Sequence, residues 1–187
     1  MLRGELVWLR ALGKADFVDG TEAVNHPDTG PNLGLKMPIG PEGAAEFAQK
    51  VLSQQGKTVY AFAVCALGES RAIGNVSLRD LDRENGSAEA SIVIVDRAYQ
   101  GRGYGSDAMR CLLDFGFGEL RLERIYLYVF DYNLRARRSY EEVGFQVDAT
   151  LRRARFHHGQ HHDVQLMSIL RGEWLAEDRL RAWDPRD

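Results

Sequence analysis

The chain has 187 residues, a formal net charge of −3, 44% hydrophobic residues and 27% charged residues. This length suits one domain with a large core, and the composition is ordinary for a soluble globular protein. The acidic balance argues against broad nucleic-acid binding, and no apolar run approaches the 18 or so residues of a membrane span, so neither partner is expected.

The N-terminal sequence and the cysteines indicate the compartment. The sequence MLRGELVWLRALGKADF interrupts its apolar residues with charges, unlike a secretory signal peptide. Cys65 and Cys111 stand in apolar stretches and lack a metal-binding spacing. Buried thiols in a reducing compartment account for them most simply. We therefore expect a cytoplasmic protein.

The first third of the chain predicts one strand, two helices and a long loop. The strand is ELVWLRAL, and a helix follows from about Lys14 until its pattern fades near His26. Residues 25–43 are dense in proline and glycine and predict an irregular loop, a kind of segment that is often functional. Pro41 is well placed as the first residue of the next helix.

Three strands are predicted next. KTVYAFAVCA and RAIGNVSLRD alternate well enough for two of them. The third, SAEASIVIVD, follows Asn85-Gly86, which is the strongest short signal for a hairpin.

A β-α-β unit is predicted after residue 87. The segment Ser106 to Phe117 has apolar residues on one helical face and polar residues on the other. RIYLYVF, from Arg124 to Phe130, is apolar on both faces, as expected of a central buried strand. The strands on either side of the helix should therefore be parallel, with a right-handed crossover. The apolar helical face comprises Met109, Leu112, Leu113 and Phe117.

The last third of the chain predicts a short helix and two paired strands. Asn133 is an apt N-cap for the helix, and Gly144 is placed to end it. FQVDATLRRARF and HDVQLMSIL predict strands around the turn HHGQ, and the amphipathic piece GEWLAEDRLRAW follows them. The element order is α+β, with one parallel crossover inside a mostly antiparallel sheet.

The glycine-rich turn is the first feature that suggests chemistry. In YQGRGYGSDAM, Gly101, Gly103 and Gly105 alternate between a strand and a helix. The spacing differs from the G-x-G-x-x-G dinucleotide fingerprint, and no Gly-Lys-Ser/Thr follows it as in a Walker loop. A turn without Cβ atoms before a helix N-terminus can still hold a pyrophosphate on free backbone N–H groups. The alternative is a tight turn with no ligand.

A second motif decides between these alternatives. NLRARRSYEEVGF places Asn133, Ala136 and Tyr140 on one helical face. YQGRGYG resembles the Q/R-x-x-G-x-G/A turn of the GNAT family of N-acetyltransferases, and Asn133 to Phe145 resembles its second acyl-CoA element, N-x-x-A-x-x-x-Y-x-x-x-G-F. The likeness is strongest to the ribosomal-protein alanine and spermidine acetyltransferases, and it extends over about residues 6–170.

The resemblance implies a fold. It is an α+β acyl-CoA N-acyltransferase fold, with a mixed, mostly antiparallel twisted sheet, a splayed parallel strand pair and flanking helices. The expected organisation is a single N-acetyltransferase domain over 1–187, with its core at about 6–170 and an amphipathic C-terminal extension at 171–187.

The resemblance also implies a co-substrate and an activity. Acetyl-CoA would donate its acetyl group directly to a primary amine of a protein N-terminus, a polyamine or another small amine, without a covalent enzyme intermediate. Pantetheine would pair with the first splayed strand, the turn would wrap the pyrophosphate, and Asn133 would bond the pantetheine or phosphate portion. The implied cofactor-binding residues are Val93, Ile94, Val95, Gln100, Gly101, Arg102, Gly103, Tyr104, Gly105, Ser106 and Asn133.

Two residues are candidates for proton transfer. The resemblance matches Tyr140 to the tyrosine near the thioester sulfur, where a phenol of pKa ~10 can protonate a leaving thiolate of pKa ~8.5. Glu89 shares a strand face with Ser91, Val93 and Val95, and its carboxylate could take the amine's proton through a water. The alternatives are a packing tyrosine and a solvated residue at the end of the strand.

Other functions fit the sequence less well. A non-catalytic acyl-CoA-binding or sensor domain would need neither Tyr140 nor Glu89, and a Rossmann oxidoreductase would need a third glycine one position later. The histidines of HHGQHHD lie at a hairpin tip, where adjacent side chains diverge, so no metal is expected. One of the arginines in RARR could reach the 3′-phosphate of CoA. Residues 25–43 are expected to form a wall of the acceptor site, and a homo-oligomer is left open.

Overall fold

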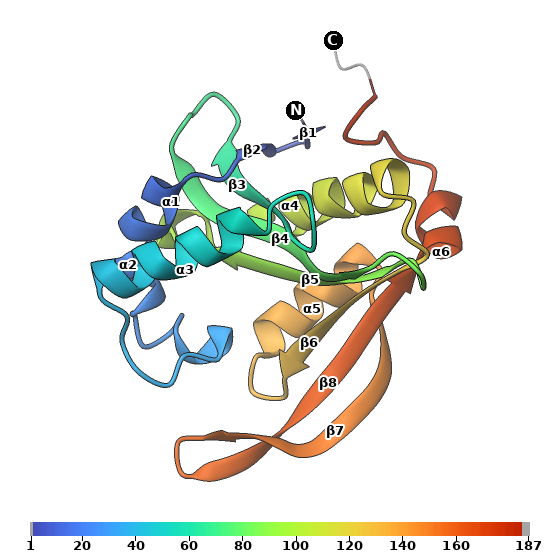
Figure 1. The fold of residues 1–187 in the computed structure, drawn as a ribbon. Helices are drawn as coiled ribbons and strands as arrows, with labels where there is room; N and C mark the ends of the chain where they lie inside the picture. Colours follow the sequence, from blue (N-terminus) through green and yellow to red (C-terminus); the bar gives the residue numbers. More distant parts are fainter. Residues whose placement is uncertain (1, 185–187) are drawn as a thin grey trace.

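The computed structural model describes residues 2–184 and contains an eight-stranded sheet with helices against it (Figure 1). The strand order is β1-β2-β3-β4-β5-β6-β8-β7, and the only parallel pair in this order is β5–β6. The strands are β1 (Leu2–Arg3), β2 (Val7–Ala11), β3 (Tyr60–Ala66), β4 (Ala72–Asp82), β5 (Ser87–Ile94), β6 (Arg124–Phe130), β7 (Gln146–His157) and β8 (Gln160–Leu170). The helices are α1 (Lys14–Asp19), α2 (Thr21–Val24), α3 (Pro41–Ser53), α4 (Tyr104–Asp114), α5 (Leu134–Val143) and α6 (Arg171–Ala176), with short turns η1 (Pro31–Leu33), η2 (Arg97–Tyr99) and η3 (Phe115–Glu119). The predicted α+β class and mixed sheet are confirmed.

The parallel pair splays as expected. Pairing between β5 and β6 covers Ser87–Glu89 opposite Arg124–Tyr126. Beyond these residues β5 continues to Ile94 and β6 to Phe130, with no further pairing between them. The backbone groups that face the gap are therefore available to a ligand.

Helix α4 packs on one face of the sheet and supplies much of the core. Its predicted apolar residues are buried, together with the inward side chains of β4, β6 and β8. Burying side chains of this size contributes ~1.5–3 kcal/mol each. The largest buried side chains are Trp174, Phe117, Leu9, Ile73, Leu78, Met109, Leu112, Leu113, Ile125, Leu127, Met167 and Ile169.

The polar face of α4 includes two buried carboxylates. Asp107 and Asp114 are both buried because distant parts of the chain bond to them. The Asp107 carboxylate accepts from the backbone N–H groups of residues 5–7 at 3.1, 2.8 and 3.0 Å, which ties the start of β2 to α4. Asp114 binds the C-terminal segment in the same way.

The N-terminal helices cover the other face of the sheet. The single helix predicted from Lys14 is divided at Gly20 into α1 and α2, whereas α3 begins at Pro41 as predicted. A smaller cluster joins these helices to β3, with Phe17 and Val51 packed on Ala61 and Ala63. Residues between α2 and α3 are irregular apart from η1, in agreement with the expected loop.

Strand β6 corrects one prediction. It is central in the sheet, but only its α4 face is buried: Ile125, Leu127 and Val129 point inward, whereas Tyr128 is 46% exposed. Within residues 2–184, no helix covers the opposite face of β6, which carries the side chains of Tyr126, Tyr128 and Phe130. RIYLYVF therefore has one buried face and one aromatic, accessible face.

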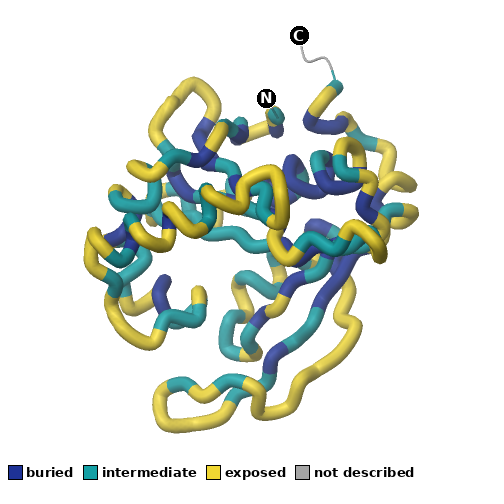
Figure 2. Tube along the Cα trace, in the orientation of Figure 1, coloured by how far each residue is buried: buried dark blue, intermediate teal, exposed yellow. Residues whose placement is uncertain are grey.

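Strands β7 and β8 form a long hairpin that extends from the body of the molecule (Figures 1 and 2). β7 is the last strand of the sheet and is exposed along nearly its whole length. The turn residues His158 and Gly159 both have positive φ, as a two-residue type I′ turn requires. We call β7, β8 and this turn the arm.

The C-terminal extension is helical only over α6 (Arg171–Ala176), and the last three residues of the predicted 171–187 extension lie outside the described residues. No helix within residues 2–184 is long and apolar enough to cross a membrane. Cys65 and Cys111 are both buried, as predicted.

Candidate active site

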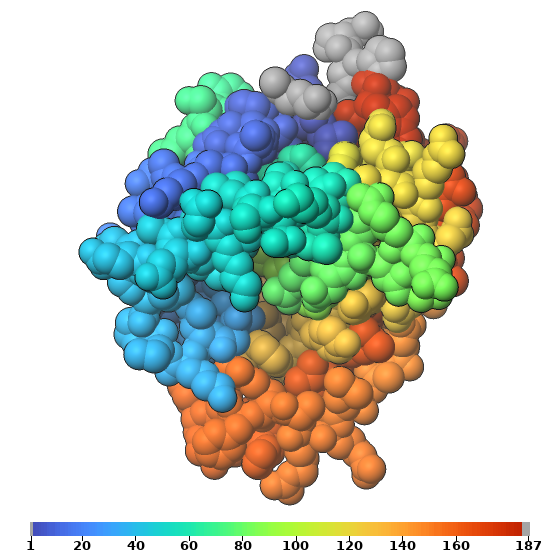
Figure 3. All heavy atoms as spheres, in the orientation of Figure 1, coloured from blue at the N-terminus to red at the C-terminus, as the bar shows by residue number. Residues whose placement is uncertain are grey.

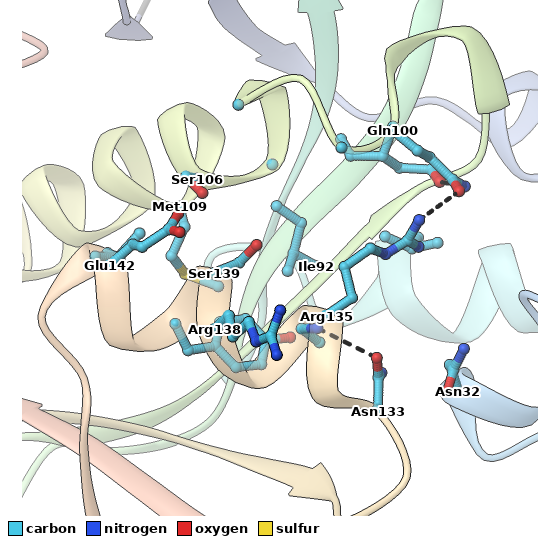
Figure 4. Close-up of a pocket in the computed structure, with 18 of the residues that line it drawn as sticks. Asn32, Ile92, Gln100, Ser106, Met109, Asn133, Arg135, Arg138, Ser139 and Glu142 are labelled. Carbon is cyan, nitrogen blue, oxygen red and sulfur yellow. Dashed lines mark hydrogen bonds between the residues drawn. The ribbon is translucent and has the colours of Figure 1, made fainter.

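A cavity of about 550 Å³ lies where β5, the glycine turn, α4 and α5 meet (Figure 4). It opens on the α4 side of the splayed strands and extends to η1. Its lining residues are Asp28, Thr29, Asn32, Leu33, Ile92, Val93, Ile94, Tyr99, Gln100, Gly101, Gly103, Gly105, Ser106, Met109, Asn133, Leu134, Arg135, Ala136, Arg138, Ser139, Tyr140, Glu142 and Val143.

The glycine turn forms one end of the cavity. Gly101 and Gly103 have φ values of +69° and +86°, which other residues rarely adopt, and Gly103 immediately precedes α4. Gly105 has no such requirement, and a Cβ there would lie 3.6 Å from the nearest protein atom, in ordinary contact. The amides of the first turn of α4 have no partner within the helix and can hold an anion.

This difference between the glycines yields a clean prediction. Gly105→Ala adds one methyl group that the protein itself accommodates, so any loss of affinity arises from the ligand's approach. We expect the Kd for CoA to rise at least tenfold, about 1.4 kcal/mol, with the melting temperature nearly unchanged. Isothermal titration calorimetry measures this, with Gly172→Ala, a helical glycine with open space around it, as the control. An unchanged Kd would contradict a phosphate contact at Gly105.

Gln100 connects the two sides of the cavity. Its side-chain Nε2 donates to the carbonyl of Ile94 at 2.7 Å, and its Oε1 accepts from Arg135 Nη1 of α5 at 3.1 Å (Figure 4). The end of β5 and the start of α5 are thereby held at a set separation. Arg135 and Arg138 both line the cavity, where arginines can bind phosphate.

Helix α5 presents one face to the cavity. Asn133 caps the helix as predicted, its Oδ1 accepting from the Ala136 amide at 3.2 Å, so its amide Nδ2 is left for a ligand. Ser139 was not singled out from the sequence, although it lies on the Ala136–Tyr140 face, three residues after Ala136. Extending the helical period would have found it.

Most of the predicted cofactor-binding residues lie together in this cavity, and three do not line it. Val95, Arg102 and Tyr104 are outside its lining. Arg102 donates to the carbonyl of Ala98 at 3.1 Å, and the Tyr104 ring packs edge-on against Tyr99. Their roles stay predictions that rest on the resemblance. Thr29 and Asn32 also line the cavity and belong to the 25–43 loop expected at the acceptor site, whereas Met109 lines it without having been predicted.

Tyr140 lies on the α5 side of the cavity and packs against Phe145, with ring centroids 6.0 Å apart. Its hydroxyl has no hydrogen-bond partner within residues 2–184. Burial raises the pKa of Tyr140 to about 12, so the phenol keeps its proton throughout the neutral range. A neutral phenol with an uncommitted O–H is suited to donate to an anion formed inside the cavity.

Glu89 lies at the fork where β5 and β6 diverge, on the face opposite α4. It is only 9% exposed, and its carboxylate is hydrogen-bonded to Arg79, its cross-strand neighbour on β4. Its parallel partner on β6 is Tyr126. The interpretation as a solvated strand-end residue is wrong, because Glu89 is buried in an ion pair; its proposed role as a base is not tested by this geometry.

The residue 25–43 loop lies beside the cavity. Asp28, Thr29, Asn32 and Leu33 contribute to the lining, so the loop borders the cofactor elements as well as any acceptor. Asn25 holds the loop in place through reciprocal bonds with Ile39, each 2.8 Å.

The expectation that adjacent histidines diverge is wrong for one pair, because the ring centroids of His157 and His158 lie 3.8 Å apart at the hairpin turn. His157 and His162 lie against the Tyr132 ring, with centroids 5.2 and 4.8 Å away, and His162 Nδ1 lies 3.0 Å from Asp131 Oδ1. His161 instead packs on Phe156. Over residues 2–184, no group of three or more His, Cys, Asp or Glu side chains is arranged to hold a metal ion.

A splayed parallel pair, a left-handed glycine turn that opens a helix and a cavity between them define a fold of the acyl-CoA N-acyltransferase class. Residues 7–146 match the family described as the acetyltransferase (GNAT) domain. The chain belongs to this family, and the resemblance stated from the two motifs is confirmed.

Two curated relatives are also N-acetyltransferases by their descriptions. The chain is 33% identical over 104 residues to a putative ribosomal N-acetyltransferase of Bacillus subtilis, covering 56% of each protein. It is 35% identical over 107 residues to a spermidine N(1)-acetyltransferase of Vibrio cholerae, covering 57% of this chain and 61% of that protein. The matched stretch thus spans little more than half the length of these relatives.

A solved structure is similar over a larger share. The crystal structure of spermidine N-acetyltransferase from Vibrio cholerae in complex with CoA and spermine superposes with a TM-score of 0.81 at 28% identity, covering 91% of this chain and 98% of that one. That enzyme was crystallised with CoA and spermine.

Proposed function

We propose that this protein is an N-acetyltransferase that moves the acetyl group of acetyl-CoA to a primary amine. The observation that carries the proposal is the shared cavity, which the glycine turn and Tyr140 both line, beside strands that diverge after Glu89. The relatives named above acetylate amines according to their descriptions, which supports the same reaction here.

The residues of this chain fit the co-substrate. The amides from Gly103 to Ser106 and the guanidinium groups of Arg135 and Arg138 would hold its phosphates. The unpaired edge of β5, from Ser91 to Ile94, would pair with the amides of pantetheine. Acetyl-CoA when bound supplies an activated thioester at the fork of the two strands.

The transfer needs two proton movements. The neutral amine attacks the thioester carbonyl, a C–N bond forms and the C–S bond breaks, so the amine nitrogen must lose a proton and the thiolate gain one. Backbone N–H groups of β5 can polarise the carbonyl. Tyr140 donates to the departing sulfur, and Glu89, held by Arg79 at the fork, takes the amine's proton through a water.

The test is an amine-panel assay with acetyl-CoA that follows the release of free thiol. The panel includes peptides with a free N-terminus, polyamines and amino-acid amides, and mass spectrometry confirms an added acetyl group. Transfer to any amine well above the rate of spontaneous hydrolysis supports the enzyme. Tight CoA binding with no transfer to any amine would favour the alternative, a non-catalytic acyl-CoA-binding domain.

The reaction should proceed without a metal. Activity after exhaustive treatment with a chelator is expected to stay within about twofold of the untreated protein, because general acid–base groups and backbone donors suffice for thioester aminolysis. Elemental analysis of the purified protein provides the control. Loss of activity that added zinc restores would contradict this expectation.

A further inference from the structure

Arg155 is a partly buried cation without an anionic partner. It lies on β7 directly opposite His162 of β8, and its guanidinium stands 5.0 Å from the centroid of the Phe130 ring. Its Nε is buried and has no hydrogen-bond partner, and within residues 2–184 no carboxylate forms an ion pair with it. Two other arginines on the sheet are paired, Arg79 with Glu89 and Arg124 with Asp148.

Three segments surround Arg155: the η1 loop, the turn that carries Tyr132, and the arm. The η1 loop approaches from one side, since the Cβ position at Gly34 is 3.9 Å from Arg155 Nη1, and the Tyr132 hydroxyl donates to the carbonyl of Pro31 at 3.2 Å. The blue loop and the orange arm meet in this way in Figure 3. Burial raises the pKa of Tyr132 and the neighbouring Arg155 opposes that rise, which places the cation beside the hydroxyl.

Strand β6 connects the surroundings of Arg155 to the point where β5 and β6 diverge. Tyr126, Tyr128 and Phe130 alternate along the accessible face of β6, starting beside Glu89 and ending beneath Arg155. Four residues of extended strand span ~13 Å at ~3.3 Å per residue. An acceptor whose amine reaches the fork on this face therefore extends about three to four peptide units before it meets Arg155.

Three carboxylates along this path are already engaged, and Asp80, whose charge helps to raise the pKa of Tyr126, is the exception. Glu89 binds Arg79, and Asp148 binds Arg124 at 2.5 Å. Asp131 accepts from the backbone N–H of Asp163 at 3.0 Å and contacts His162. A polycationic acceptor would find few uncommitted anions here, whereas a partly buried guanidinium whose Nε has no partner favours an anionic ligand.

We propose that Arg155, stacked on Phe130, binds a carboxylate carried by the amine acceptor, so that the acceptor is an acidic, peptide-like amine and not a polyamine. The proposal rests on the proposed acetyltransferase function and adds the chemical class of the acceptor. Arginine suits this role because its planar fork binds carboxylates bidentately while its face rests on an aromatic ring. The carboxylate can belong to an acidic side chain of a peptide or to a free amino acid.

Matched acceptors test the proposal and distinguish these two sources. Ser-Ala-Ala-Asp-amide is compared with Ser-Ala-Ala-Asn-amide, 10-aminodecanoate with decylamine, and spermidine serves as the polycation, because these acids are long enough to span the path. We expect kcat/KM to be about tenfold or more higher for the acidic member of at least one pair, and higher than for spermidine. Preference in the peptide pair alone identifies an acidic peptide, and preference in the second pair alone a small free acid.

Variants assign the preference to one side chain. Arg155→Gln should bring the ratio of kcat/KM for the acidic to the neutral acceptor to about one. Arg155→Lys keeps the positive charge but loses the planar guanidinium, so it should retain part of the preference. Arg152→Gln removes an exposed charge from the same strand and should leave the ratio unchanged. Equal kcat/KM values within both pairs, or an unchanged ratio in Arg155→Gln, would overturn the proposal while leaving the acetyltransferase function intact.

A binding measurement separates the site from the activity. Histidine side-chain NMR signals of the whole protein are followed during titration with glutarate, because His162 lies directly opposite Arg155. A saturable shift of the His162 signals in wild type that is lost in Arg155→Gln supports an anion site, even if none of the amines tested is acetylated. The absence of any shift at saturating glutarate would reject it.

Discussion

Replacing Tyr140 with phenylalanine is expected to lower kcat by ~10²–10⁴-fold, the usual contribution of a general acid, and to leave the affinity for acetyl-CoA nearly unchanged. The substitution removes only the hydroxyl and preserves the ring that packs on Phe145. The hydroxyl lines the cavity and bonds to no other described residue, so its loss should cost little stability. Stopped-flow or steady-state thiol release gives kcat, and calorimetry gives the affinity.

The pKa of Tyr140 sets the form of this catalysis. Burial raises it to about 12, well above the pKa of ~8.5 of a free thiol, so complete proton transfer to the thiolate would be unfavourable. A hydrogen bond donated to the developing thiolate stabilises the transition state without complete proton transfer. Desolvation of the sulfur in the same cavity raises the pKa of the thiol and so brings it closer to that of Tyr140. The hydroxyl therefore acts mainly as a donor to negative charge.

The direction in which kcat/KM changes with pH follows from the pKa of Tyr140. The neutral phenol is the active form, and it persists until the pH rises towards about 12. The kcat/KM profile should accordingly rise as the amine and its base lose protons, with no descending alkaline limb from Tyr140 below about pH 11. A kcat of Tyr140→Phe within about threefold of wild type would return Tyr140 to a packing role and leave the thiolate to solvent.

The sequence located the glycine turn and the α5 face of the cavity, but it did not indicate the surroundings of Arg155. Backbone geometry requires Gly101 and Gly103, and a helical period groups Asn133 with Tyr140, so local rules were sufficient there. Arg155 is one of many arginines in the sequence. Its position opposite His162 and above Phe130 depends on strand register, which local patterns do not contain.

The limits of the sequence interpretation have a common physical origin. The helical period places Asp107 and Asp114 on the polar face of α4 but does not show that both are buried, because the donors that satisfy them lie about 100 and 60–68 residues away in the sequence. Conversely, RIYLYVF was expected to be buried on both faces, yet nothing covers Tyr128. Periodicity shows which residues share a face, but tertiary contacts decide what lies against that face.

Asp114→Ala is expected to lower the free energy of unfolding by about 3–5 kcal/mol, the usual cost of removing one partner from a buried charged pair. Asp114 is 1% exposed and accepts from Trp174 Nε1 at 2.9 Å, from Arg179 Nη2 at 2.5 Å and from the Ala182 amide at 2.7 Å. Its removal leaves these donors without an acceptor in a region that excludes water.

The C-terminal segment depends on this one carboxylate. The guanidinium of Arg179 also lies 3.9 Å from the centroid of the Trp174 ring, so the cation, the indole and the carboxylate form a single cluster that fixes the residues after α6 to α4. For a chain of this size, 3–5 kcal/mol corresponds to a decrease of roughly 6–20 °C in Tm. Urea unfolding and calorimetry measure the two quantities independently.

Asp148→Ala provides the matched control for the loss of a paired aspartate. Asp148 bonds Arg124 at 2.5 Å, but both side chains are about one-third exposed, so its removal should cost within about 1 kcal/mol. A large difference between the two variants assigns the stability to burial of Asp114 and not to charge pairing as such. If Asp114→Ala loses no more than Asp148→Ala, Trp174 packing alone holds the C-terminal segment, because the indole would then stay buried without its hydrogen bond.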